Sequence, residues 1–147
     1  MRDVLMAARK FRLAIEQSPP KLVSFAFFPA GSCGDASELL GEYFVDSVLG
    51  QWVYRTGFGP SASTHGWIEQ EGVIADITAD QFVKWDAPKP VIVTRDRAWH
   101  DRYFPTQAGS RPAGLDFWDG PTHDQVALAY AQLRVLADES DADRLGE

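Results

Sequence analysis

Residues 64–78 read THGWIEQEGVIADIT, and this stretch decides the fold. Its two halves are rich in β-branched and aromatic residues, and they flank the dipeptide Glu71-Gly72, which is typical of a tight turn. If Glu71-Gly72 is a two-residue hairpin loop, Gln70 pairs with Val73. The stretch therefore predicts an antiparallel β-hairpin.

This register has a consequence for two polar residues of the hairpin. Counting back from the turn sets Trp67 opposite Asp76 and His65 opposite Thr78, so that His65 and Asp76 are diagonal neighbours on one face. Diagonal Cα atoms lie roughly 7 to 8 Å apart, within reach of a hydrogen bond between imidazole and carboxylate. A three-residue loop would instead send the two side chains to opposite faces.

The remaining sheet is predicted from two further strand patterns. We expect strands over residues 51–57 and 90–94, which together with the hairpin form a mostly antiparallel sheet. Residues 95–120 are rich in Asp, Pro, Gly and aromatic residues without a clean period, and they predict a long, partly packed loop.

Apolar residues spaced by three and four predict three helices. Ser32 is expected to cap the second helix, with Asp35 as the acid of a short capping box, and Val48 is the last apolar residue of its stripe. A capping box of Thr122 and Gln125 is expected to start the third. The predicted helices cover residues 3–17, residues 32 to about 50, and residues 122 to about 136.

Alternating helices and strands in a chain of 147 residues predict one α+β domain. We expect this domain to cover residues 1–138 and to be followed by a frayed acidic tail, 139–147.

Composition excludes several classes of partner and compartment. The net charge of −7 repels a phosphate backbone, so no nucleic acid partner is expected. We expect no membrane partner, because the longest nearly apolar run, 22–30, is far below the roughly 18 residues that cross a bilayer. Charges interrupt the N-terminal apolar positions, unlike a signal peptide, and one cysteine cannot form an internal disulfide. A cytoplasmic location is therefore expected.

That cysteine, Cys33, falls at the predicted start of the second helix. Unpaired amides and the helix dipole at such a position favour a reactive thiolate, although most free cysteines are inert core residues. A nucleophile also needs a base, and His65 with Asp76 as its partner is the best placed by pattern. We therefore expect Cys33, His65 and Asp76 to form a catalytic triad.

Three other residues compete for these roles. His100 lies next to Asp101 and is interpreted as a surface-loop histidine, because adjacent residues seldom converge on one point. His123 is interpreted as a surface residue in the first turn of the last helix. Asp80 is an alternative orienting acid, or else it caps the turn that follows the hairpin.

The segments GSCGDAS (31–37) and HGWIEQEGVIADIT (65–78) resemble the papain-like and transglutaminase-like cysteine hydrolase superfamily, including its small bacterial members. The resemblance implies a helix that begins with Cys33 and packs on a mostly antiparallel sheet. It also implies that Cys33 is the nucleophile, His65 the base and Asp76 the orienting acid.

The chain departs from this superfamily in the oxyanion donor. Papain-type enzymes carry a glutamine a few residues before the cysteine, and SFAFFPAGS (24–32) has none. Gln51, Trp67 and Gln81 are weaker candidates for the donor and for substrate contact.

These features predict a thiol hydrolase or acyltransferase that needs no cofactor and acts on an amide or thioester. Its substrate is expected to be a protein, a peptide or a small amide. Two alternatives remain: a binding domain that uses the aromatic-rich segment 99–118, and a zinc site built from Cys33, His65 and Asp76.

Overall fold

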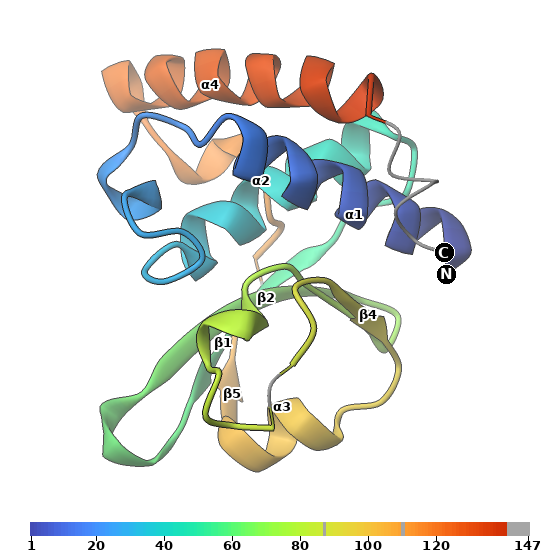
Figure 1. The fold of residues 1–147 in the computed structure, drawn as a ribbon, viewed down its shortest axis with the longest axis vertical. Coiled ribbons are helices and arrows are strands. Elements are labelled where there is room, and N and C mark those ends of the chain that lie inside the picture. The colour runs from blue at the N-terminus through green and yellow to red at the C-terminus, as the bar shows by residue number, and fades with distance from the viewer. Residues whose placement is uncertain (87, 110, 141–147) are drawn as a thin grey trace.

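The computed structural model describes residues 1–86, 88–109 and 111–140, and in this part the chain forms four α-helices and a five-stranded sheet (Figure 1). The sheet order is β4-β3-β2-β1-β5, and every neighbouring pair is antiparallel. The prediction of an α+β fold with a mostly antiparallel sheet is confirmed. The elements are α1 (Arg2–Gln17), α2 (Cys33–Asp46), β1 (Val53–Phe58), β2 (Thr64–Gln70), β3 (Val73–Asp76), β4 (Ile92–Thr94), α3 (Ala98–Tyr103), β5 (Thr106–Ala108) and α4 (Gly120–Asp138).

The β2–β3 hairpin has the predicted register. Gln70 pairs with Val73, so that the loop between the strands has two residues. Both loop residues have positive φ, 50° at Glu71 and 80° at Gly72, as a turn that matches the twist of the strands requires. His65 and Asp76 consequently share a face of the sheet.

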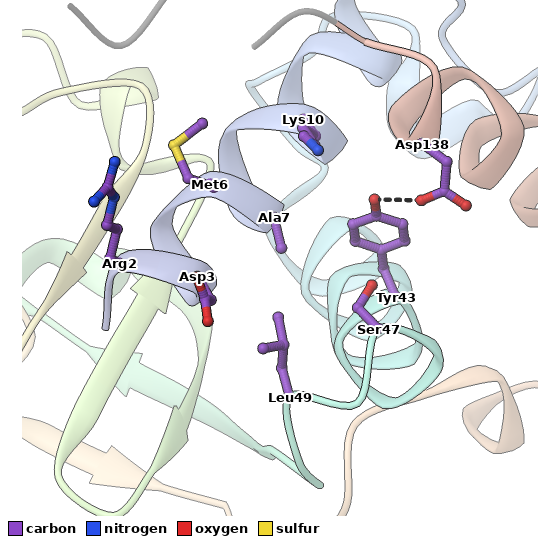
Figure 2. A pocket seen from close by; sticks show the side chains of 9 residues that line it. All are labelled: Arg2, Asp3, Met6, Ala7, Lys10, Tyr43, Ser47, Leu49 and Asp138. Carbon is purple, nitrogen blue, oxygen red and sulfur yellow. Dashed lines mark hydrogen bonds between the residues drawn. The ribbon is translucent and has the colours of Figure 1, made fainter. Parts of the chain in front are cut away.

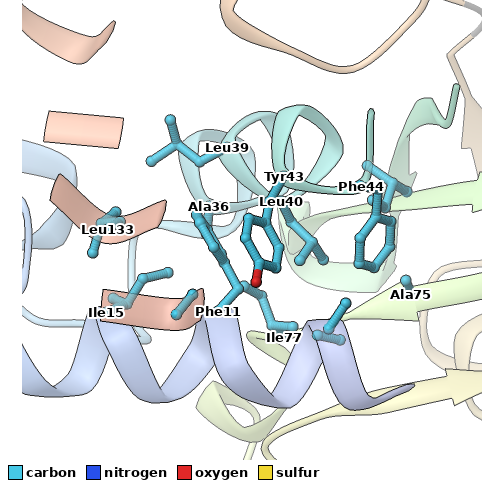
Figure 3. Close-up of a cluster of buried hydrophobic side chains, with 14 of the residues drawn as sticks. Phe11, Ile15, Ala36, Leu39, Leu40, Tyr43, Phe44, Ala75, Ile77 and Leu133 are labelled. Carbon is cyan, nitrogen blue, oxygen red and sulfur yellow. The ribbon is translucent and has the colours of Figure 1, made fainter. Parts of the chain in front are cut away.

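The main core lies between the sheet and a layer formed by α1, α2 and α4. Helix α1 packs against both α4 and α2, and α2 packs against β2. Figure 3 shows apolar side chains of these three helices meeting those at the end of the hairpin. The residues labelled there are Phe11, Ile15, Ala36, Leu39, Leu40, Tyr43, Phe44, Ala75, Ile77 and Leu133.

A second, largely aromatic cluster lies on the other face of the sheet. Trp67 belongs to it, whereas its neighbour Ile68 belongs to the main core, because successive strand side chains point to opposite faces. Both faces of β3 are covered in this way, and all four of its residues are buried. The cluster consists of Trp67, Ile74 and Phe104, with Phe82, Trp85, Trp99 and Tyr103 packed around them.

The prediction of a loop over residues 95–120 is wrong for part of that segment. It contains the two-turn helix α3 and the edge strand β5, which pairs with β1. Both elements are too short to show a period in the sequence, and their packing against the aromatic cluster and β1 stabilises them.

The second predicted helix ends four residues earlier than expected. The chain leaves α2 after Asp46, Val48 adopts a φ of 58°, and the N–H of Leu49 donates back to the Phe44 carbonyl. Val48 is 90% exposed, so its place at the end of the apolar stripe was coincidental.

Both predicted capping boxes are also wrong. Ser32 precedes α2, but its hydroxyl donates to the Pro29 carbonyl, while Asp35 accepts from Ser24. Helix α4 begins at Gly120, with a proline in the first turn, which places Thr122 inside the helix instead of at its cap.

The domain extends at least through Asp138, where α4 ends. Of the predicted acidic tail, residues 141–147 lie outside the described residues. Within the described part of the chain, no helix combines the length and apolar character needed to cross a bilayer.

Candidate functional site

The Asp76 carboxylate is the centre of a buried polar group. Its Oδ2 atom lies 2.7 Å from Nε2 of His65 and 2.7 Å from Nε2 of His100. Its Oδ1 atom accepts the backbone N–H of Thr78 at 3.0 Å. All three ionisable side chains are 1% exposed or less as residues, so these hydrogen bonds form away from water.

The charges of this group follow from its contacts. Burial disfavours the Asp76 carboxylate, but the charge and hydrogen bonds of His65 and His100 outweigh burial and hold its pKa well below the usual range. An ionised carboxylate only accepts hydrogen bonds, so Nε2 of each histidine carries a hydrogen. Each histidine therefore has only its Nδ1 atom left for another partner.

The environment of His65 raises the pKa of its imidazole. Burial lowers its pKa, but the charge of Asp76 and the hydrogen bond to it act in the opposite direction and raise the pKa to about 9. The nearby Cys33 adds to this increase, although no hydrogen bond between its sulfur and the imidazole meets the geometric limits. The thiol of Cys33 therefore lies beside the imidazole of His65.

The free ring nitrogen of His65 is the one available to this thiol. Nε2 is engaged by Asp76, and among the described residues Nδ1 has no partner that meets hydrogen-bond geometry. Cys33 is the first residue of α2 and is only partly buried. Of the three residues predicted from the sequence, His65 and Asp76 are in direct contact on the aromatic face of the sheet, whereas Cys33 begins the helix that covers the other face and forms no hydrogen bond with His65.

Aromatic rings enclose the two histidines. The His65 ring lies 5.0 Å from Phe82 and 5.3 Å from Phe104, measured between ring centroids. The His100 ring meets Trp67 at 4.8 Å and Trp99 at 4.9 Å. These rings exclude water from the Asp76 hydrogen bonds and hold both imidazoles in place.

His100 is the residue that sequence interpretation missed. The prediction of a surface-loop histidine is wrong, because His100 lies on α3, is 1% exposed and donates to Asp76. The neighbouring Asp101 points away and accepts from Gln107. The aromatic spacing of Trp99, Tyr103 and Phe104 around His100 was the available signal, since it marks a buried helical face.

The candidate oxyanion donors are engaged in other contacts. The Trp67 ring contacts His65, but the residue is fully buried and its indole N–H donates to Glu69. The Gln81 amide donates to the Thr78 carbonyl at 3.0 Å.

Gln51 lies at the far end of β2 from His65. Its carbonyl accepts from Gln70, the last residue of that strand, and its amide donates to the Ala113 carbonyl at 3.2 Å. It is therefore remote from Cys33.

The two remaining candidates have structural roles or surface positions. Asp80 accepts two hydrogen bonds of 2.8 Å from Arg12 of α1, so it neither orients His65 nor caps the turn. His123 lies in the first turn of α4 with its side chain 37% exposed, as predicted.

The sequence predicts Cys33, His65 and Asp76 as alternative zinc ligands, but a different set of three side chains converges in the structure. Candidate ligand atoms of His65, Asp76 and His100 all lie within 4.8 Å of one another, and Cys33 is not part of this set. Two ligands at zinc distances in a tetrahedral site are about 3.3 Å apart. The 2.7 Å separations to Asp76 are shorter than this and suit direct hydrogen bonds.

A cavity of about 750 Å³ lies away from Cys33, between the start of α1 and the ends of α2 and α4 (Figure 2). Tyr43, one of its lining residues, donates to Asp138 across its wall. Its lining contains no nucleophile paired with a base, so we place the chemistry at the convergent polar group instead. The lining residues are Arg2, Asp3, Met6, Ala7, Lys10, Tyr43, Ser47, Leu49 and Asp138.

Comparison of the chain with protein-family models, with curated proteins and with solved structures gives no match. The functional assignment therefore depends on the geometry described above.

Proposed function

We propose that this protein is a thiol hydrolase or acyltransferase of papain-like or transglutaminase-like type, with Cys33 as nucleophile, His65 as base and Asp76 as orienting acid. Its substrate is an amide or thioester of a protein, a peptide or a small molecule. The observation that carries the proposal is the 2.7 Å contact from His65 Nε2 to Asp76, which leaves Nδ1 as the nitrogen available to Cys33.

The first half of the reaction forms an acyl-enzyme. His65 Nδ1 takes the proton of the Cys33 thiol, and the sulfur attacks the carbonyl carbon of the substrate. The pKa of about 9 keeps this proton on His65 near neutral pH. His65 then donates the proton to the leaving amine or thiolate as the bond from carbonyl carbon to leaving group breaks.

The second half releases the acyl group. Water or an amine gives a proton to His65 Nδ1 and attacks the thioester carbonyl, and the Cys33 sulfur leaves and recovers the proton. Asp76 accepts the hydrogen on Nε2 throughout, so the imidazole keeps its tautomer and orientation.

The first test is alkylation of Cys33 by iodoacetamide near neutral pH, followed by mass spectrometry. The His65→Gln variant keeps an N–H donor toward Asp76 but has no base. We expect it to alkylate about 10- to 100-fold more slowly than wild type, because proton removal by a positioned base contributes at least this much.

The matched control is His123→Gln, which removes the partly exposed histidine of α4 and should alkylate at the wild-type rate. Cys33→Ser should show no labelling at all, because this is the only cysteine of the chain. Equal alkylation rates for wild type and His65→Gln at every pH would contradict the pairing of thiol and imidazole.

A further inference from the structure

Tyr54 of β1 extends its hydroxyl group toward two glycines, Gly34 and Gly66. A Cβ atom placed on Gly66, the residue after His65, would lie 2.4 Å from the Tyr54 hydroxyl oxygen. A Cβ atom placed on Gly34, the residue after Cys33, would lie 3.4 Å from the same oxygen. The hydroxyl therefore occupies the space between the two glycines.

The strand register explains this position. Tyr54 pairs with Ile68 on β2, and Thr56 pairs with Gly66. Tyr54 and Gly66 are therefore diagonal neighbours on the face that α2 covers, and an aromatic side chain spans such a diagonal. Only glycine at position 66 lets the phenol cross the strand toward the start of α2, since any side chain there would collide with it.

The hydroxyl of Tyr54 carries its proton near neutral pH. Burial raises the pKa of Tyr54, with the charges of Cys33 and Glu38 acting in the same direction, and together they outweigh Thr56 and Arg111, which lower it. Tyr54 can therefore donate a hydrogen bond to a negative charge that develops beside Cys33.

The side chain is also accessible from outside. Tyr54 lines an open hollow of about 350 Å³ between β1 and the segment that follows β5. A substrate bound in this hollow would contact the phenol. The other lining residues are Thr56, Phe58, Ala108, Gly109 and Arg111.

We propose that the Tyr54 hydroxyl donates a hydrogen bond to the oxyanion that forms when the Cys33 sulfur adds to the substrate carbonyl. The backbone N–H of Cys33 is the second donor, because the first amides of a helix have no partner within it. This inference depends on the proposed function. It supplies an oxyanion donor in place of Trp67 and Gln81, whose N–H groups already donate to Glu69 and to the Thr78 carbonyl.

The test uses two probes that differ in whether an oxyanion forms. p-Nitrophenyl acetate acylates the thiolate through a tetrahedral oxyanion, whereas iodoacetamide alkylates the thiolate by displacement at a saturated carbon. Tyr54→Phe removes only the hydroxyl. We expect its acylation rate to fall by about 100-fold, the lower range for losing one oxyanion donor, while its alkylation rate stays within about threefold of wild type.

The matched control is Tyr130→Phe, which removes a hydroxyl that donates to Asp46 at the opposite end of α2 from Cys33. It should leave both rates unchanged. Gly66→Ala displaces the Tyr54 hydroxyl without removing it and should reproduce the selective loss of acylation, which keeps the proposal testable if Tyr54→Phe folds poorly. Circular dichroism of each variant checks its fold.

Three results would overturn the proposal, and they are distinguishable. If both rates stay at the wild-type value in Tyr54→Phe, the hydroxyl has no role. If both rates fall together, Tyr54 acts on the thiolate or on His65 and not on the oxyanion. If wild type shows no acylation that depends on Cys33, the proposed function itself fails, and the inference fails with it.

Discussion

Asp76 shows how one buried carboxylate can hold two imidazoles. Its Oδ2 atom accepts from His65 and His100 at the same distance, 2.7 Å, and its Oδ1 atom accepts from the backbone of Thr78. A buried charge without partners is strongly destabilising, so these three donors make the carboxylate tolerable inside an aromatic cluster. The same contacts fix the orientation of His65 toward Cys33.

The His65–Asp76 pair makes the stability of the fold depend on pH. The pKa of His65 is about 9 in the folded state, above its usual 6.5. The pair therefore stabilises the protein fully below about pH 6.5, and this contribution is lost as the pH rises through about 9. We expect the free energy of unfolding of Cys33→Ser, in which no thiol titrates, to fall in urea titrations as the pH rises above about 6.5, with the fall complete below about pH 9 because Cys33 no longer helps to raise the pKa of His65.

The comparison variant is Cys33→Ser/Asp76→Asn, which lacks the carboxylate that raises the pKa of His65. Its free energy of unfolding should be lower near neutral pH and should change much less between about pH 6.5 and about pH 9. Parallel curves for the two variants would show that Asp76 does not raise the pKa of His65.

At the scale of elements, the turn of the β2–β3 hairpin sets the geometry of the site. Because the loop has two residues, His65 and Asp76 fall on one face of the sheet. The turn requires positive φ at both loop residues, which glycine adopts readily and glutamate does not. Glu71 is therefore the strained member of the pair.

Substitutions in this turn test the explanation. Glu71→Asn should raise the free energy of unfolding by about 0.5 kcal/mol, because asparagine tolerates positive φ. Gly72→Ala should lower it by about 1 kcal/mol, since a Cβ atom is unfavourable at a φ of 80°. Glu71→Gln, which removes only the charge, serves as the control in urea unfolding, and a gain equal to that of Glu71→Asn would assign the effect to charge.

At the scale of the whole molecule, Arg12 joins the helical layer to the segment that follows β3. Its guanidinium donates to the Ile77 carbonyl at 2.6 Å and forms two hydrogen bonds of 2.8 Å with Asp80. Burial opposes the charge of Arg12, but the hydrogen bonds and charges of Asp80 and Glu16 outweigh burial and raise the pKa of Arg12 above its usual range. The Arg12 side chain is only 8% exposed, so it remains charged inside the fold.

Removal of this cation should destabilise the whole domain. We expect Arg12→Ala to lower the free energy of unfolding by about 3 kcal/mol, because it leaves the Asp80 charge without its partner. Arg2→Ala, at an exposed position of the same helix, should change it by less than about 0.5 kcal/mol. Equal effects of the two substitutions in urea unfolding would show that the Arg12 contacts contribute no net stability.

The sequence by itself determined the α+β class, the position of Cys33 at the start of a helix, and the pairing of His65 with Asp76. These features depend on local rules: apolar periodicity, and a two-residue turn that sets the register of adjacent strands. The residues involved are near neighbours along the chain or in one hairpin, 11 positions apart for His65 and Asp76. Local pattern is therefore sufficient to predict them.

Only the tertiary structure decided that His100 joins Asp76, that Tyr54 crosses Gly66, and that Arg12 binds Asp80. His100 and Asp76 are 24 positions apart in the chain, and Arg12 and Asp80 are 68 positions apart. No apolar period in the surrounding segments predicts that these residues meet. The physical reason is that such contacts depend on how whole elements pack, and packing follows from the combined burial of many side chains and not from any local pattern.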